Sequence, residues 1–191
     1  MVNFIETDFP GLVVVEPKVF GDERGFFMES YNEKDFSEGW IPNTFIQDNH
    51  SKSRRNVLRG LHYQVQHTQS KLVRVIAGSV YDVAVDLREG SPTYGKRFGI
   101  ELSAENKKQL FVPKWFAHGF VTKEDDTEFL YKCDDIYHQA SEGGILRNDP
   151  TLDINRAEHC DINNLVLSPK DTKNQLFEVF RKTNPFMFQE S

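Results

Sequence analysis

The sequence has few cysteines and no excess of basic residues, and each shortage excludes a class of protein. Only Cys133 and Cys160 are present among 191 residues, and no C-x-x-C spacing occurs. Two cysteines are too few for a disulfide scaffold, so we expect reduced thiols and a cytoplasmic protein. With 23 Lys and Arg against 29 Asp and Glu, the net charge of −6 argues against nucleic acid as a partner. A local basic pocket for a phosphorylated ligand is compatible with that charge.

Long apolar runs are also absent. No stretch approaches the roughly 20 apolar residues that a membrane-crossing helix needs. The segment Met1–Glu6 lacks the basic region followed by an apolar one that marks a signal peptide. We therefore expect no membrane partner. No repeat, linker or low-complexity tract divides the chain, so we expect one domain over residues 1–191 with a short C-terminal helical segment.

Aromatic content and alternation indicate β-structure. The 16 Phe and 6 Tyr favour strands. Val83, Val85 and Leu87 recur at every second position in a stretch that Asp82, Asp86 and Arg88 interrupt, which predicts a half-buried strand. Ala77-Gly78 predicts a hairpin turn after a strand over 72–76. Many short strands between turn signals are typical of a sandwich or barrel. Further strands are expected at 11–16, 26–31, 97–102, 109–112, 118–122, 128–133 and 164–167.

Helix signals are sparse. Residues 32–36 predict one turn or two. Near the C-terminus Ser168 suits a helix cap, Pro169 the first helical position, and Asp171 the positive end of the helix dipole. The apolar stripe of this predicted helix consists of Leu176, Val179 and Phe180.

The segment 57–64 carries one histidine, His62, with no second histidine two positions on. A metal-binding cupin barrel would have His-x-His here, whereas a lone imidazole suits acid–base chemistry near neutral pH. The competing interpretation is a metal-dependent cupin enzyme that uses His62, His67 and His118 with an acid. The missing second ligand argues against that site, so no metal and no cofactor are expected.

Eight motifs occur in one order along nearly the whole chain, from about Gly11 to about Lys173. They are residues 16–27, 47–51, 58–64, 71–75, 116–120, 129–133, 148–150 and 167–171. Together they resemble the dTDP-4-dehydrorhamnose 3,5-epimerase family. The resemblance implies a mainly β, cupin-like double-stranded β-helix (jelly roll) with a few short helices. It also implies a homodimer with exchanged N-terminal strands.

Two positions depart from the family pattern. Trp115 stands where the family often has glycine, so we expect it to alter the mouth of the pocket. Residues 154–157 replace an Ile-x-Trp-Pro motif, so this region is expected to pack differently.

The implied reaction inverts carbons 3 and 5 of dTDP-4-dehydro-6-deoxy-D-glucose to give dTDP-4-dehydro-L-rhamnose. A proton next to the ketone is removed, which leaves an enolate, and a proton is returned to the opposite face. The site therefore needs a base, an acid and a positive group at the enolate oxygen. The alternatives are a mono-epimerase acting at carbon 3 or 5, the metal-dependent enzyme, and a binding protein without activity.

By the resemblance, His62 is the base and Asp171 orients it, Tyr131 is the acid, and Lys71 stabilises the enolate oxygen. Each has a plainer interpretation. His62 and Tyr131 would be core side chains, Asp171 a helix-start acid, and Lys71 a solvated lysine.

The resemblance also implies a binding set for the dTDP-sugar partner. It comprises Arg24, Glu29, Gln47, Asp48, Asn49, Arg59, His118, Glu142 and Lys170, with Tyr137 stacking on the base. In the family the segment 24–29 can reach the partner subunit's pocket. Arg59 would face away from His62 on an ideal strand, which predicts a bulge at Gly60.

Overall fold

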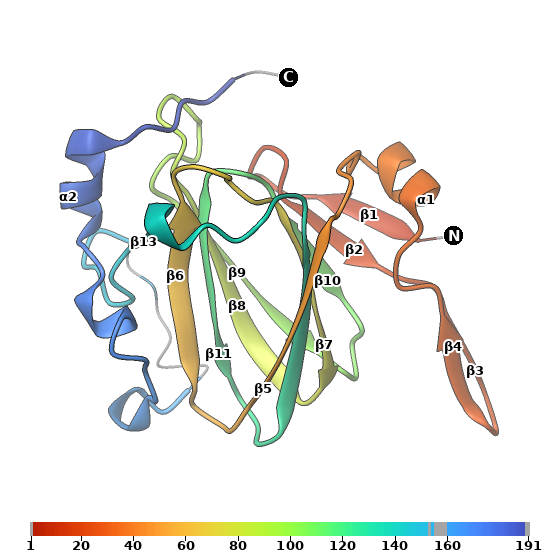
Figure 1. Cartoon of the computed structure of the whole chain (residues 1–191). Helices are drawn as coiled ribbons and strands as arrows, with labels where there is room; N and C mark the ends of the chain where they lie inside the picture. The colour runs from red at the N-terminus through yellow and green to blue at the C-terminus, as the bar shows by residue number, and fades with distance from the viewer. Residues whose placement is uncertain (1, 153, 155–159, 190–191) are drawn as a thin grey trace.

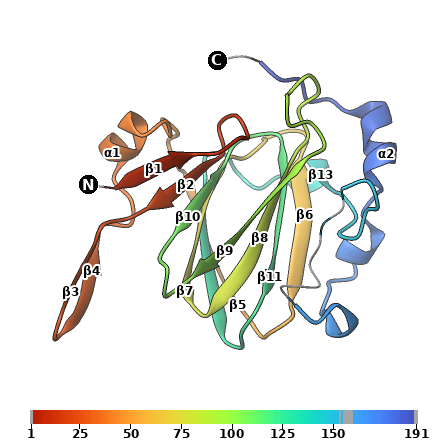
Figure 2. The same cartoon turned by 180° about the vertical axis from the view of Figure 1, so that it is seen from behind.

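Two antiparallel sheets face each other in the computed structural model, which describes residues 2–152, 154 and 160–189 (Figure 1). The six-stranded sheet has the order β1 (Asn3–Glu6), β2 (Val13–Glu16), β10 (Gln109–Val112), β7 (Lys71–Ala77), β12 (Thr127–Cys133), β5 (Gln47–Ser53). The five-stranded sheet has the order β13 (Glu142–Gly144), β6 (Leu58–Gln64), β11 (Phe116–Thr122), β8 (Ser79–Asp86), β9 (Arg97–Ser103). A hairpin of β3 (Val19–Asp22) and β4 (Gly25–Met28) projects away from both sheets (Figure 2). The predicted mainly β jelly roll is confirmed.

Side chains that alternate along each strand build the core between the sheets. On β12, Phe129 and Tyr131 pack inward, while Lys132 faces the outer side and pairs with Asp48. Buried apolar residues from both sheets, among them Val73 of β7, form one cluster between the sheets. Each large apolar side chain buried in this way contributes about 1.5–3 kcal/mol, so the cluster fixes the two sheets against each other.

The strand predicted around Val83 is confirmed as β8, but the prediction that it is half-buried is wrong, because β8 is buried on both faces. Val80 and Ala84 pack between the sheets, whereas Val83 and Val85 pack under the C-terminal segment with Phe180. That segment lies along the outer face of the five-stranded sheet (Figure 2). The residues that cover this face of β8 lie nearly a hundred positions later in the chain, so the local sequence pattern around β8 does not predict its burial.

The turn at Gly78 is present, with φ 70°, but it does not close a hairpin. β7 pairs with β10 and β12, whereas β8 pairs with β9 and β11 in the opposite sheet. The predicted hairpin is therefore wrong. The short connection instead crosses from one sheet to the other. A turn motif in the sequence predicts a turn, but it does not distinguish such a crossing from a hairpin.

Most other predicted strands are confirmed. These are 11–16, 97–102, 109–112, 118–122 and 128–133, which correspond to β2, β9, β10, β11 and β12. The prediction for 26–31 is too long, because β4 ends at Met28. The strand predicted at 164–167 is wrong: Val166 makes only an isolated bridge to Val57. The polar strand β5 was not predicted, since its residues carry no apolar alternation.

The helix predicted near residue 32 is confirmed as α1 (Glu33–Glu38). The Asn32 side chain accepts hydrogen bonds from the N–H groups of Lys34 and Asp35, which satisfies two of the free donors at the helix start. Phe36 then packs on the outer face of the six-stranded sheet. No helix within residues 2–152, 154 and 160–189 is long and apolar enough to cross a membrane.

The continuous C-terminal helix predicted from Ser168 is wrong. The segment forms separate turns, η3 (Asp171–Lys173), α2 (Phe177–Phe180) and η4 (Arg181–Thr183). Gln175 between them is extended, because it bridges to Ile145 at the end of β13. Of the predicted apolar stripe only Phe180 is buried. Leu176 and Val179 are exposed, and Phe177, which was not predicted, supplies the second buried ring.

Candidate active site

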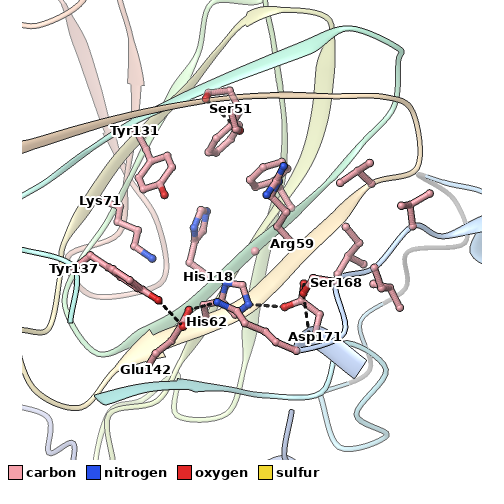
Figure 3. A pocket seen from close by; sticks show the side chains of 18 residues that line it. Ser51, Arg59, His62, Lys71, His118, Tyr131, Tyr137, Glu142, Ser168 and Asp171 are labelled. Atoms are coloured by element: carbon pink, nitrogen blue, oxygen red, sulfur yellow. Dashed lines mark hydrogen bonds and ion pairs between the residues drawn. The ribbon is translucent and has the colours of Figure 1, made fainter. Parts of the chain in front are cut away.

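A cavity of about 620 Å³ opens between the two sheets beside the C-terminal segment (Figure 3). All four residues predicted to be catalytic line it. Its polar lining consists of Ser51, Arg59, His62, Lys71, His118, Tyr131, Tyr137, Glu142, Ser168, Lys170 and Asp171. An adjoining recess shares several of these residues and adds Gln47, Asn49 and Gln64.

His62 on β6 is paired with Asp171, 109 positions later in the chain. Nε2 of His62 lies 2.5 Å from Oδ1 of Asp171, and the two side chains are 24% and 3% exposed. Burial alone would raise the pKa of Asp171, but hydrogen bonds from His62 and Ser168 outweigh it and lower the pKa. An ionised, buried carboxylate therefore holds one imidazole nitrogen, and Nδ1 is the nitrogen that does not face Asp171.

The same carboxylate also takes part in the local turn. The Ser168 hydroxyl donates to Oδ2 of Asp171 at 2.7 Å and accepts the Asp171 N–H at 3.2 Å. The plainer interpretation of Asp171 as a turn residue and its pairing with His62 are thus both found in the structure. Ser168 was not among the predicted site residues, although its spacing from Asp171 in the sequence predicts this bond.

A bulge in β6 places Arg59 and His62 on the same side of the sheet. The register with β11 shifts so that Gly60 and Leu61 together face one residue, Gly119. Gly60 has φ 114°, and a Cβ there would lie 2.5 Å from the Gly119 Cα, so the position requires glycine. The predicted bulge is confirmed, and it explains why both side chains line one cavity.

Tyr131 and Lys71 reach the cavity from the sheet opposite His62 (Figure 3). Tyr131 packs beside Phe129 with ring centroids 6.0 Å apart, and burial raises the pKa of its hydroxyl, which is therefore protonated at neutral pH. Burial likewise lowers the pKa of Lys71, although nearby acidic groups such as Glu142 oppose the shift. Within the described part of the chain the Lys71 ammonium has no ion-pair partner, so it is available to an oxygen in the cavity.

A second carboxylate–imidazole pair lies beside the first. His118 on β11 is the cross-strand neighbour of His62. Its Nε2 lies 2.9 and 3.0 Å from the two carboxylate oxygens of Asp82, and the side chains of His118 and Asp82 are 7% and 0% exposed. Asp82 was not predicted as a site residue. The signal for it was an acidic residue inside the apolar stretch of β8, because a buried acid requires a partner.

The side chains of Tyr137, Glu142 and Lys170 form a connected group at one end of the cavity. The Tyr137 hydroxyl donates to Oε2 of Glu142 at 2.9 Å, and the Lys170 ammonium donates to Oε1. Burial opposes ionisation of Glu142, but these hydrogen bonds lower its pKa. Gln47 accepts the Tyr137 N–H at 2.9 Å, and the Tyr137 residue stays 51% exposed, so its ring can stack on a planar ligand.

Three predicted binding residues do not line the cavity of their own chain. Asp48 lies on the outer face of the six-stranded sheet, where it pairs with Lys132 at 2.9 Å. Arg24 lies in the β3–β4 hairpin with its side chain 85% exposed and paired with Asp22. Glu29, just after β4, is exposed as well.

The histidines of the alternative metal site do not converge. His67 pairs with Asp135 at 3.2 Å on exposed loops, whereas His62 and His118 pair with separate buried carboxylates. Across residues 2–152, 154 and 160–189, no group of three or more His, Cys, Asp or Glu could hold a metal ion.

The two departures from the family pattern lie away from the cavity or outside the described residues. Trp115 has φ 68° and packs against the cluster under the C-terminal segment, so the expected effect on the pocket mouth is wrong. The left-handed backbone explains why glycine suits this position. Residues 155–157 of the other departure lie outside the described part of the chain.

Comparisons with known proteins identify the family of the whole chain. A family model described as dTDP-4-dehydrorhamnose 3,5-epimerase matches residues 6–178. The dTDP-4-dehydrorhamnose 3,5-epimerase of Shigella flexneri is 51% identical over 92% of this chain and 96% of its own, and that of Salmonella typhimurium is 56% identical over 81% and 85%. The crystal structure of dTDP-6-deoxy-D-glucose-3,5-epimerase from Legionella pneumophila in complex with dTDP-4-keto-L-rhamnose has a TM-score of 0.94 and 46% identity, and covers 100% of both chains.

Proposed function

Because the chain belongs to the dTDP-4-dehydrorhamnose 3,5-epimerase family, we propose that it converts dTDP-4-dehydro-6-deoxy-D-glucose to dTDP-4-dehydro-L-rhamnose. The observation that carries the proposal is a base and an acid from opposite sheets in one cavity. His62, held by Asp171, belongs to the five-stranded sheet, and Tyr131 belongs to the six-stranded sheet. Inversion at carbon needs proton removal on one face and proton delivery on the other, which this arrangement supplies.

In the proposed reaction His62 takes the proton from carbon 3 or carbon 5. The electron pair of the broken C–H bond moves onto the ketone oxygen as an enolate, while Asp171 stabilises the imidazolium. The Tyr131 hydroxyl then gives its proton to the opposite face of the same carbon, and the ketone reforms. Proton exchange with solvent restores both side chains, so the reaction is an isomerisation with no change in redox state.

Lys71 and His118 suit the enolate oxygen. Lys71 is half-buried without an ion-pair partner among the described residues, and His118 is held by the buried Asp82. Donors fixed in a site that excludes water stabilise developing charge more than mobile water does.

The group around Tyr137 suits the nucleoside diphosphate. The exposed Tyr137 ring offers a stacking surface for the base, and Arg59 and Lys170 offer cations for the diphosphate. Gln47 and Asn49 line the adjoining recess with amide donors and acceptors.

We also propose that the active unit is a homodimer. The β3–β4 hairpin exposes Phe20, Phe26 and Phe27 by 54%, 59% and 70%, an apolar surface that a second copy would bury. Arg24 and Glu29 lie on or beside this hairpin and do not reach the cavity of their own chain. If the β3–β4 hairpin packs on a second copy, Arg24 and Glu29 would reach the cavity of that partner.

Deuterium exchange tests the reaction. The protein is incubated with dTDP-4-dehydro-6-deoxy-D-glucose in D2O and the product is followed by NMR. We expect deuterium at both carbon 3 and carbon 5, and no exchange in a His62→Ala variant that still binds dTDP. Exchange at one carbon alone would support the mono-epimerase alternative. Binding of dTDP without any exchange would refute the epimerase and leave a binding protein.

A further inference from the structure

Gln64, the last residue of β6, is a buried glutamine that the reaction above does not use. Its exposed fraction is 6%. We propose that Gln64 is a positioning residue that sets nucleotide affinity by holding Tyr137 in place. The inference rests on the proposed function, because it assigns Tyr137 to the nucleotide base.

The side-chain amide of Gln64 makes hydrogen bonds to the two residues that flank Tyr137 in the chain. Its Nε2 donates to the Ile136 carbonyl at 3.2 Å, and its Oε1 accepts from the His138 N–H at 3.0 Å. The same Nε2 donates to the His67 carbonyl at 2.6 Å. One side chain therefore ties the residues that flank Tyr137 to the loop that follows β6.

Tyr137 depends on such anchors because its own ring is not packed in a core. The residue is 51% exposed, and it lies outside any strand, between β12 and the short turn η1 (Gln139–Ser141). Its remaining anchors are the bond from its N–H to Gln47 and the bond from its hydroxyl to Glu142. A ring held in the bound position before the ligand arrives loses less conformational freedom on binding, so anchoring increases affinity.

The Gln64 amide makes no hydrogen bond to the proposed base or acid among the described residues. Its partners are main-chain groups of Ile136, His138 and His67. Loosening these bonds should therefore weaken binding of the nucleotide and leave the chemical steps unchanged.

Gln64→Met tests the inference, since methionine has a similar length and makes none of the three bonds. Calorimetry with dTDP alone should show Kd raised by roughly three- to tenfold, as expected for the loss of a few net hydrogen bonds and some pre-organisation. KM should rise to the same extent, with kcat within about twofold of wild type. The matched control is Gln175→Met, because the Gln175 amide donates to the Tyr63 hydroxyl at 2.8 Å and lines neither part of the cavity. The control should keep Kd within about twofold.

A double mutant separates positioning from general loosening of the fold. In a Tyr137→Ala background, Gln64→Met should change the dTDP affinity by less than about twofold, because the side chain that it positions is gone. The same fold-change in both backgrounds would overturn the inference. If Gln64→Met does not fold, Gln64→Glu serves instead: it keeps the acceptor for the His138 N–H and places charge against two carbonyls. An unchanged Kd in the Gln64→Glu variant would likewise overturn it. Wild-type protein that fails to bind dTDP would refute the proposed function, which is a different result.

Discussion

Replacing Asp171 by asparagine isolates the charge behind the proposed base. Asparagine keeps the shape of the side chain and removes the carboxylate that lies 2.5 Å from His62 Nε2. If the new amide donates to Nε2, the imidazole proton moves to Nδ1, which is the nitrogen that would receive the substrate proton. If the amide carbonyl accepts from Nε2 instead, the tautomer survives but the imidazolium loses its counter-charge. Both outcomes weaken the base.

The magnitude follows from burial. The Asp171 side chain is 3% exposed, so water screens the pair little. Two unit charges about 4 Å apart interact by about 4 kcal/mol at an effective dielectric constant of about 20. An interaction of that size, made only as the imidazolium forms, corresponds to about 10³-fold in rate. We therefore expect kcat/KM of Asp171→Asn to fall by about 10³-fold, within the usual range for general acid–base catalysis.

Deuterium wash-in followed by NMR measures proton abstraction directly, and calorimetry with dTDP checks that binding is intact. The matched control is Glu128→Gln, which removes the carboxylate from the exposed His50–Glu128 pair, 2.9 Å apart on the outer face of the sheet. We expect wild-type exchange in that control. Wild-type exchange in Asp171→Asn itself would refute the reasoning, since the carboxylate would then serve only the turn with Ser168.

Four further outcomes are expected. Tyr131→Phe keeps the ring and removes the donor, so inverted product should fall by about 10²–10⁴-fold while exchange persists at one carbon at least. Normal product formation would assign the donor to another group. Mixing Arg24→Ala with His62→Ala chains should restore some activity, because a mixed dimer holds one intact cavity; a fully active monomer in equilibrium sedimentation would exclude this. Gly60→Ala should lower the free energy of unfolding in urea by roughly 2–4 kcal/mol, because φ is 114° and the new Cβ would meet backbone, and an unchanged midpoint would contradict the bulge. Burial opposes ionisation of Asp86, but hydrogen bonds from its neighbours lower its pKa below the ordinary 3.8. The ionised Asp86 carboxylate therefore contributes fully to stability above pH 3.8, and this stabilisation is lost as the pH falls through the lowered pKa of the folded state. Asp86→Asn has no carboxylate to protonate at this position, so its free energy of unfolding should fall less than that of wild type below pH 3.8.

Local patterns in the sequence determined the strands with clear alternation and the residue types of the site. β12 can be predicted because aromatic residues, which favour strands, stand two positions apart at Phe129 and Tyr131. The start of α1 can be predicted because the Asn32 cap acts on N–H groups two and three residues away. The segment around His62 is informative for the same reason, since the lone imidazole and the bulge glycine both lie within it. In each case the physical cause is a contact between near neighbours in the chain.

Contacts between distant segments decided the rest, and no local pattern contains them. β5 is polar, and it is a strand because it pairs with β12 along its whole length. β8 is buried on both faces because the C-terminal segment covers it. The sequence left two interpretations open for Asp171, and the packing of η3 against β6 decides its contacts: the carboxylate meets His62, and the N–H bonds to Ser168 within the turn. The sequence thus determined which chemical groups are present, whereas tertiary packing decided which of them meet.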